Sequence, residues 1–134
     1  MLKLKLTLLL FFIYTASFSQ TTSTIDKLDS SYQSCLDKGM DMYGCSLHYY
    51  NQMDSMLNIV YKQLRAKKDS SQKIILKSKQ LKWLSARDKY FKQVDNEPSN
   101  GLDGNDRRMA AIDKKALYVE KRVIELIKEL EIKQ

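Results

Sequence analysis

Hydrophobic residues recur every three or four positions in three long stretches of the chain, which is the spacing of amphipathic α-helices. The spacing predicts helices over about 45–67, 72–94 and 105–130, and a shorter helix over about 30–38 that ends at Gly39. The stripe of the last helix holds no charge and runs through Met109, Ile112, Ala116, Val119, Val123, Leu126 and Leu130. This uncharged stripe predicts that the last helix packs along the groove between the other two long helices.

The other two stripes each contain one charged residue. The first consists of Leu47, Tyr50, Asp54, Leu57, Tyr61 and Leu64, and the second of Leu76, Gln80, Trp83, Arg87, Tyr90 and Val94. An antiparallel hairpin about residues 68–71 places Asp54 across from Arg87, and the same register pairs Leu64 with Leu76. Because breaking a buried ion pair costs about 3–5 kcal/mol, the predicted role of this pair is to hold the hairpin register. The structural polar core is predicted to consist of Asp54, Asn58, Tyr61, Gln80, Trp83 and Arg87.

Two connections carry turn signals. Asp69, followed three residues later by Gln72, forms the pattern of a capping box at the start of a helix. The segment 95–106 holds the only proline and two of the four glycines, which predicts a loop. Its charged residues before the next helix are all acidic: Asp95, Glu97, Asp103 and Asp106. Together these elements predict an all-α protein, an antiparallel three-helix bundle with a short N-terminal helix in front.

The first 19 residues have the layout of a secretory signal peptide. Two lysines supply a positive start, residues 6–14 are apolar apart from one threonine, and small residues precede a predicted cut near Ser19/Gln20. A membrane-spanning helix needs about 20 apolar residues, roughly twice the length present. We therefore predict a cleaved signal peptide over 1–19, a flexible leader over 20–28 and one helical domain over 29–134. The mature protein is then periplasmic or secreted.

Cys35 and Cys45 are the only cysteines of the chain. In the oxidising compartment to which a signal peptide leads, an isolated pair usually forms a disulfide. Redox and haem motifs have two residues between their cysteines, and His48 is the only further ligand nearby, so no metal site is predicted. A disulfide here closes a loop of about eleven residues, which would stabilise the fold by roughly 3 kcal/mol.

The chain is basic, with 23 lysines and arginines against 16 acidic residues and a net charge of +7. Removal of the signal peptide takes away two lysines and no acid, which lowers the charge to +5. Basic chains are candidates for nucleic-acid binding, but export argues against it and leaves anionic envelope polymers and lipids. Basic residues gather near the turn after the first long helix, and the candidate anion-binding end consists of Lys62, Arg65, Lys67, Lys68, Lys73 and Lys77. The alternative is a solvated basic surface without a partner.

Catalytic machinery is not visible in the sequence. It contains no recognisable nucleophile–base pair, phosphate-binding loop or metal-ligand set. The polar residues of the stripes are predicted to lie in packed helix faces, where they serve the scaffold. We therefore predict a non-enzymatic protein without a cofactor.

The same polar residues carry a resemblance to a known family. Asp54-x-x-Leu57-Asn58-x-x-Tyr61-x-x-Leu64, followed by Leu76-x-x-x-Gln80-x-x-Trp83-Leu84-x-x-Arg87-Asp88, resembles the signature of the LprI-type domain. That domain forms the N-terminal part of a mycobacterial lysozyme inhibitor and also occurs alone in small exported bacterial proteins. The resemblance covers about 30–130.

The cysteines agree with this resemblance in part. Cys35 and Cys45 fit the first two cysteines of the family, but two further cysteines common in its members are missing. Phe91 stands near one of those places, and the last helix has no cysteine. Since both are missing together, the resemblance implies that they pair with each other in relatives, which leaves Cys35 and Cys45 to pair here.

The resemblance implies a binding protein of the cell envelope, with lysozyme or another envelope protein as its partner. Lysozymes of the animal type are basic and cleave with two carboxylates in a cleft. The acidic loop is therefore the candidate partner-binding loop, through Asp95, Glu97, Asp103 and Asp106. The alternative function is a basic envelope module that binds peptidoglycan or anionic lipid without inhibiting lysozyme.

Overall fold

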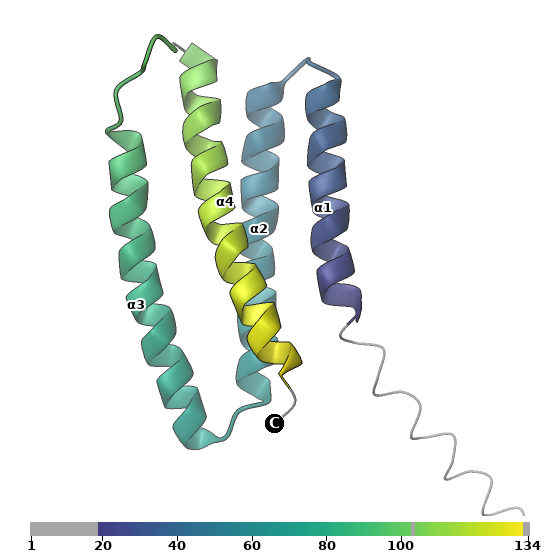
Figure 1. Cartoon of the computed structure of the whole chain (residues 1–134), viewed down its shortest axis with the longest axis vertical. Coiled ribbons are helices and arrows are strands. Elements are labelled where there is room, and N and C mark those ends of the chain that lie inside the picture. The colour runs from purple at the N-terminus through teal and green to yellow at the C-terminus, as the bar shows by residue number, and fades with distance from the viewer. Residues whose placement is uncertain (1–18, 103, 133–134) are drawn as a thin grey trace, which may run out of the picture.

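The computed structural model describes residues 19–102 and 104–132, with side chains described from residue 23 onward. The regular structure of these residues is α-helical and consists of α1 (Ser19–Asp37), α2 (Met42–Ala66), α3 (Ser70–Asp95) and α4 (Gly104–Glu131). In Figure 1, α4 lies against α2, with α1 on one side of this pair and α3 on the other. The all-α prediction is confirmed, as four long helices rather than three long helices and one short one.

The core is centred on α2 and α4. The uncharged stripe of α4 is buried from Ala116 to Leu130, and α2 contributes eight buried residues, including Met53, Val60 and Leu64. Each fully buried aliphatic side chain contributes about 1.5–3 kcal/mol relative to an exposed one. This double stripe therefore supplies most of the apolar burial that holds the fold.

Helix α1 begins earlier than the sequence predicts. Residues 20–28, expected as a flexible leader before a helix starting near Ser30, lie within α1. Ile25 is buried in the core cluster, and Leu28 and Tyr32 pack against that cluster. These three residues are spaced by three and four, so the helix continues over a Thr/Ser-rich segment because its inner face is apolar. The predicted signal peptide over 1–19 lies outside the described residues, except for Ser19.

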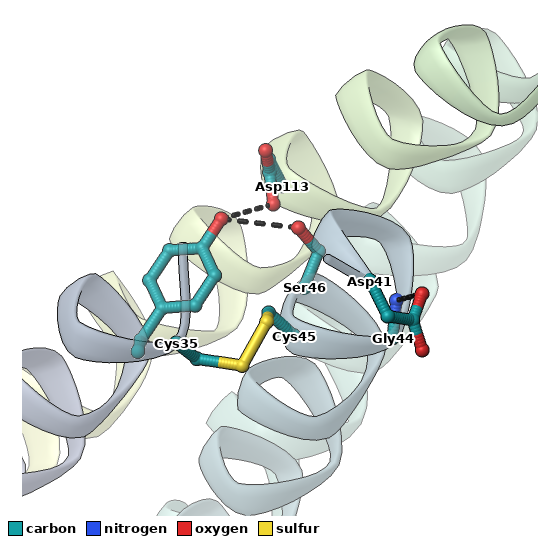
Figure 2. The surroundings of a disulfide bond; sticks show 7 residues. Cys35, Asp41, Gly44, Cys45, Ser46 and Asp113 are labelled. Atoms are coloured by element: carbon teal, nitrogen blue, oxygen red, sulfur yellow. Dashed lines mark hydrogen bonds between the residues drawn. A yellow bond between two sulfur atoms is a disulfide. The ribbon is translucent and has the colours of Figure 1, made fainter. Parts of the chain in front are cut away.

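The predicted disulfide is confirmed. Cys35 in the last turn of α1 bonds to Cys45 near the start of α2, with their Cα atoms 5.8 Å apart (Figure 2). The start of α2 is capped by Asp41, whose carboxylate accepts a hydrogen bond from the Gly44 amide at 2.9 Å. The capping box of α3 is also confirmed, because Asp69 and Gln72 each accept a hydrogen bond from the other's backbone amide.

The packing of α3 differs from the predicted hairpin. Its backbone approaches that of α4, whereas the backbones of α2 and α3 hardly approach each other along their length. Only Leu76, Gln80 and Val94 of α3 are buried. The predicted pairing survives at the turn end, where Leu64 and Leu76 belong to one buried cluster. The central helices are thus α1, α2 and α4, with α3 attached mainly through α4.

Candidate functional site

A groove opens between α2 and α3, whose backbones lie apart along most of their length although Tyr50 and Phe91 are in ring contact with centroids 6.1 Å apart. Its volume is about 580 Å³. Three leucines contribute an apolar part, and the remaining side chains that line the groove are polar or charged. The lining residues are Asp54, Leu57, Asn58, Tyr61 and Arg65 from α2 and Lys77, Gln80, Leu81, Leu84 and Arg87 from α3.

The predicted ion pair between Asp54 and Arg87 is not formed. Arg87 donates from Nε and Nη2 to Oδ1 of its neighbour Asp88, at 3.0 and 2.7 Å. Asp54 nevertheless lies in the same region, since burial and the Asp54 carboxylate raise the pKa of Tyr50 while Arg87 lowers it. The two charges share the groove without a direct bond, and both remain in contact with solvent.

The predicted polar core is also mostly unburied. Of its six residues only Gln80 is buried, Asn58 is exposed, and the other four are half-buried. The physical reason is that an ion pair loses hydration when two helices close over it. The α3 helix instead binds α4, which leaves Asp54 and Arg87 hydrated.

The attachment of α3 to α4 is aromatic and cationic. Tyr118 of α4 stacks on Tyr90 with ring centroids 4.6 Å apart and on Trp83 at 5.8 Å. Arg122 donates from Nε and Nη2 to Oε1 of Gln80 at 3.2 and 3.1 Å, and its guanidinium lies 5.8 Å from the Trp83 ring centroid. Sequence reasoning missed Tyr118 and Arg122, although their spacing of four residues places both on one face of α4.

A second polar cluster joins α1, α2 and α4. The Tyr49 hydroxyl lies 2.5 Å from Oδ1 of Asp29 and 3.1 Å from Oε2 of Glu120. Burial, and then the hydrogen bond to Asp29, raise the pKa of Tyr49 well above its usual value. Burial and the Asp29 charge also raise the pKa of Glu120. The sequence pattern did not indicate this cluster, because its two acids lie beside the apolar stripes rather than inside them.

A neighbouring contact ties the disulfide end of the bundle together. The Tyr32 hydroxyl donates to Oδ1 of Asp113 at 2.7 Å and lies 3.1 Å from the Ser46 hydroxyl (Figure 2). The ring of Tyr32 stacks on Tyr49 with centroids 4.6 Å apart. These contacts join the same three helices as the Tyr49 cluster, so both clusters serve to hold α1 in place.

The acidic loop is partly neutralised by α4. Asp95 pairs with Lys115 at 2.6 Å, and Glu97 pairs with Lys114. Arg107 donates from Nη2 to the Glu97 carbonyl at 3.0 Å, which holds the loop against the helix. Of the other two candidate residues, Asp106 is exposed in the first turn of α4, and Asp103 lies outside the described residues. A depression of about 390 Å³ lies between this loop and the start of α4.

The candidate anion-binding end is brought together in part. Lys62, Arg65 and Lys73 line a second depression that shares Asn58 and Tyr61 with the α2–α3 groove. Lys77 lines the groove itself. The other two members are used by the fold, since Lys68 pairs with Glu129 at 3.5 Å and Lys67 is the C-cap residue of α2.

Within residues 19–102 and 104–132, no group of three or more His, Cys, Asp or Glu side chains is arranged to hold a metal ion. In the same part of the chain, no helix combines the length and the apolar content needed to cross a membrane.

Comparison with known protein families gives a match. The family model described as lysozyme inhibitor LprI matches residues 27–126, from the third turn of α1 well into α4. The match includes the α2–α3 groove, the acidic loop and both cysteines. No curated protein and no solved structure matches the chain.

Proposed function

The chain belongs to the lysozyme inhibitor LprI family, and on this basis we propose that it is an exported, non-enzymatic binding protein whose partner is a lysozyme. The observation that carries the proposal is the extent of the family match over residues 27–126. In this proposal, residues 1–19 are a signal peptide and the mature protein acts in the periplasm or outside the cell.

The surface proposed to meet lysozyme is the acidic loop between α3 and α4, which stands at one end of the bundle in Figure 1. A basic chain and a basic lysozyme repel each other at long range, which slows association. A local acidic segment reduces this repulsion where the two surfaces meet. The bond from Arg107 to the Glu97 carbonyl orders the loop before binding, which lowers the entropy cost of association.

The ion pairs of the loop do not prevent such a contact. The side chains of Glu97 and Lys114 are both more than one-third exposed, and exposed ion pairs contribute only about 0–1 kcal/mol. A lysozyme lysine or arginine can therefore replace Lys114 at little cost. We propose that Asp95, Glu97, Asp103 and Asp106 pair with basic side chains of lysozyme.

The test is inhibition of cell-wall lysis by purified, oxidised protein. The combined change of Asp95→Asn, Glu97→Gln and Asp106→Asn should weaken both lysozyme binding and inhibition at low salt. The matched control neutralises three exposed acids elsewhere, Asp26→Asn, Asp37→Asn and Glu131→Gln, and should retain both. Lysis that proceeds unimpaired at an excess of the wild-type protein would remove the proposal.

A second candidate function is binding to peptidoglycan or anionic lipid without inhibition of lysozyme. The observation that favours it is the depression that gathers Lys62, Arg65 and Lys73 without an acidic side chain in its lining. This function predicts retention on cell-wall sacculi or anionic vesicles that weakens as salt rises. Retention that is insensitive to salt would contradict the electrostatic basis of this candidate.

A further inference from the structure

The groove between α2 and α3 has the size and chemistry of a site for a small ligand. Its volume of about 580 Å³ falls within the range of roughly 300–1,000 Å³ found for such sites. Neutral hydrogen-bonding groups, charges and leucines meet in it from two helices. The groove lies apart from the acidic loop, so a ligand here does not depend on lysozyme binding.

The charges are distributed unequally along the groove. The helices run antiparallel, so Arg65 and Lys77 meet at one end while Asp54 and Arg87 meet at the other. The eleven-residue separation of Asp54 and Arg65 corresponds to about 16 Å along a helix axis. An extended peptide advances about 3.3–3.6 Å per residue, so a segment of about four to five residues spans the two ends.

We propose that this groove binds a short peptide of about four to five residues that has a free amino end and an acidic residue at its carboxyl end. The peptide's ammonium group pairs with Asp54, the one carboxylate in the groove lining. Its two terminal carboxylates, from the main chain and the last side chain, pair with Arg65 and Lys77. The adjoining depression supplies Lys62 and Lys73 at this same end.

The middle of the groove suits a peptide backbone. Asn58, Tyr61 and the Nε2 group of Gln80, whose Oε1 accepts from Arg122, offer hydrogen-bonding groups there, and the exposed Leu81 offers an apolar contact for a small side chain. Arg87 uses Nε and Nη2 for Asp88, which leaves Nη1 for a peptide carbonyl. A ligand that contacts both walls also bridges α2 and α3, which the fold itself does little to join.

Tryptophan fluorescence can report whether a peptide binds in the groove. Trp83 is the only tryptophan, and its ring centroid lies 5.7 Å from the guanidinium carbon of Arg87. Titration of the full mature protein with the synthetic tetrapeptide Ala-Ala-Ala-Glu should change the Trp83 fluorescence with a saturating curve. Hydrogen exchange of α3 amides should slow at saturation because the ligand bridges this helix to α2.

The two ends of the peptide are tested separately. Acetylation of the amino end should weaken binding to the wild type about tenfold. Asp54→Asn should remove this difference while leaving the affinity for the acetylated peptide almost unchanged. Replacement of the terminal residue by glutamine amide should likewise weaken binding, and the combination of Arg65→Gln and Lys77→Gln should remove that second difference.

A matched control uses Lys82→Gln and Lys89→Gln, two exposed α3 residues outside the groove lining. This control should bind the peptide as the wild type does, and thermal melts establish that every variant is folded. If the control loses as much affinity as the Arg65→Gln and Lys77→Gln variant, the loss reflects the net charge of the protein and not contacts in the groove. Pyrophosphate binding as tight as the tetrapeptide, or the absence of saturable binding by any of the peptides, would overturn the proposal. Neither result bears on lysozyme inhibition, which the lysis assay measures independently.

Discussion

Helices α3 and α4 follow each other in the chain and have similar lengths, 26 and 28 residues, but they are held in the fold in different ways. Helix α4 buries six side chains, all apolar, and packs closely on α2. Helix α3 buries three side chains, one of them Gln80, and is held by aromatic and guanidinium contacts to α4. The difference teaches that the weakly packed helix leaves a polar face open, while the strongly packed one supports it.

The largest contrast between the two helices is expected from leucine truncation. Leu126→Ala in α4 removes a fully buried side chain and should lower the free energy of unfolding by about 2–5 kcal/mol. Leu81→Ala in α3 removes a side chain that is 56% exposed and should stay within about 0.5 kcal/mol of the wild type. Urea unfolding measures both. Similar losses in the two variants would mean that α3 is packed as tightly as α4.

The disulfide stabilises the strongly packed part of the molecule. Replacement of both Cys35 and Cys45 by serine should lower the free energy of unfolding by about 3 kcal/mol, because the loop between these cysteines, which are ten positions apart, is no longer closed in the unfolded chain. Hydrogen exchange should become faster mainly in α1. Faster exchange in α3, with α1 unchanged, would contradict the view that α1 relies on this bond and α3 does not.

The attachment of α3 is tested at Tyr118. Tyr118→Leu keeps an apolar side chain but removes the stacking on Tyr90 and Trp83, which should cost about 0.5–1.5 kcal/mol. The lost protection against hydrogen exchange should concentrate in α3. Lys121→Gln is a matched control at an exposed position of the same helix outside this aromatic contact and should leave α3 protection unchanged.

The pH dependence of stability tests the polar cluster that Glu120 forms with Tyr49 and Asp29 on the strongly packed side of the molecule. Burial raises the pKa of Glu120 above its ordinary value of 4.5, so the folded protein binds this proton more readily than the unfolded chain. The stabilising contribution of the bound proton is complete below pH 4.5 and is lost as the pH rises through the raised folded value. The wild type should therefore gain stability relative to Glu120→Gln when the pH falls from 7 towards 4.5.

Thermal melts over that range measure the difference between the two proteins. Glu125→Gln is the control, since Glu125 is an exposed glutamate of the same helix. A melting temperature of the wild type that falls relative to that of Glu120→Gln as the pH rises would agree with this prediction. A difference in melting temperature that stays constant with pH would contradict the role of Glu120.

The smallest expected effect is the coupling between Asp54 and Arg87. The structure records no ion pair between these two side chains, so the effects of Asp54→Ala and Arg87→Ala on stability should add to within about 0.5 kcal/mol. Urea unfolding of the two single variants and the double variant measures the coupling. A coupling above about 1 kcal/mol would show that α3 closes onto α2 in solution and that the groove is filled by the protein itself.

Much of the local structure follows from the sequence. The apolar stripes of α2 and α4, the capping box of Asp69 and Gln72, and the Cys35–Cys45 disulfide were predicted and are observed. Each depends on residues that are close in the chain or on chemistry that leaves few alternatives. The polar residues that line the groove were also identified, but as parts of a closed helix interface.

The choice of packing partners required the tertiary structure. An apolar or aromatic stripe shows which face of a helix is buried but does not show which helix covers it. Trp83 and Tyr90 were expected to face α2, yet they stack on Tyr118 of α4, and Asp54 and Arg87 consequently stay hydrated in an open groove. The sequence by itself determined the long helices, the capping box of α3 and the disulfide. Long-range packing decided that the charged residues form the wall of a cavity, because hydration of two separated charges competes with their pairing.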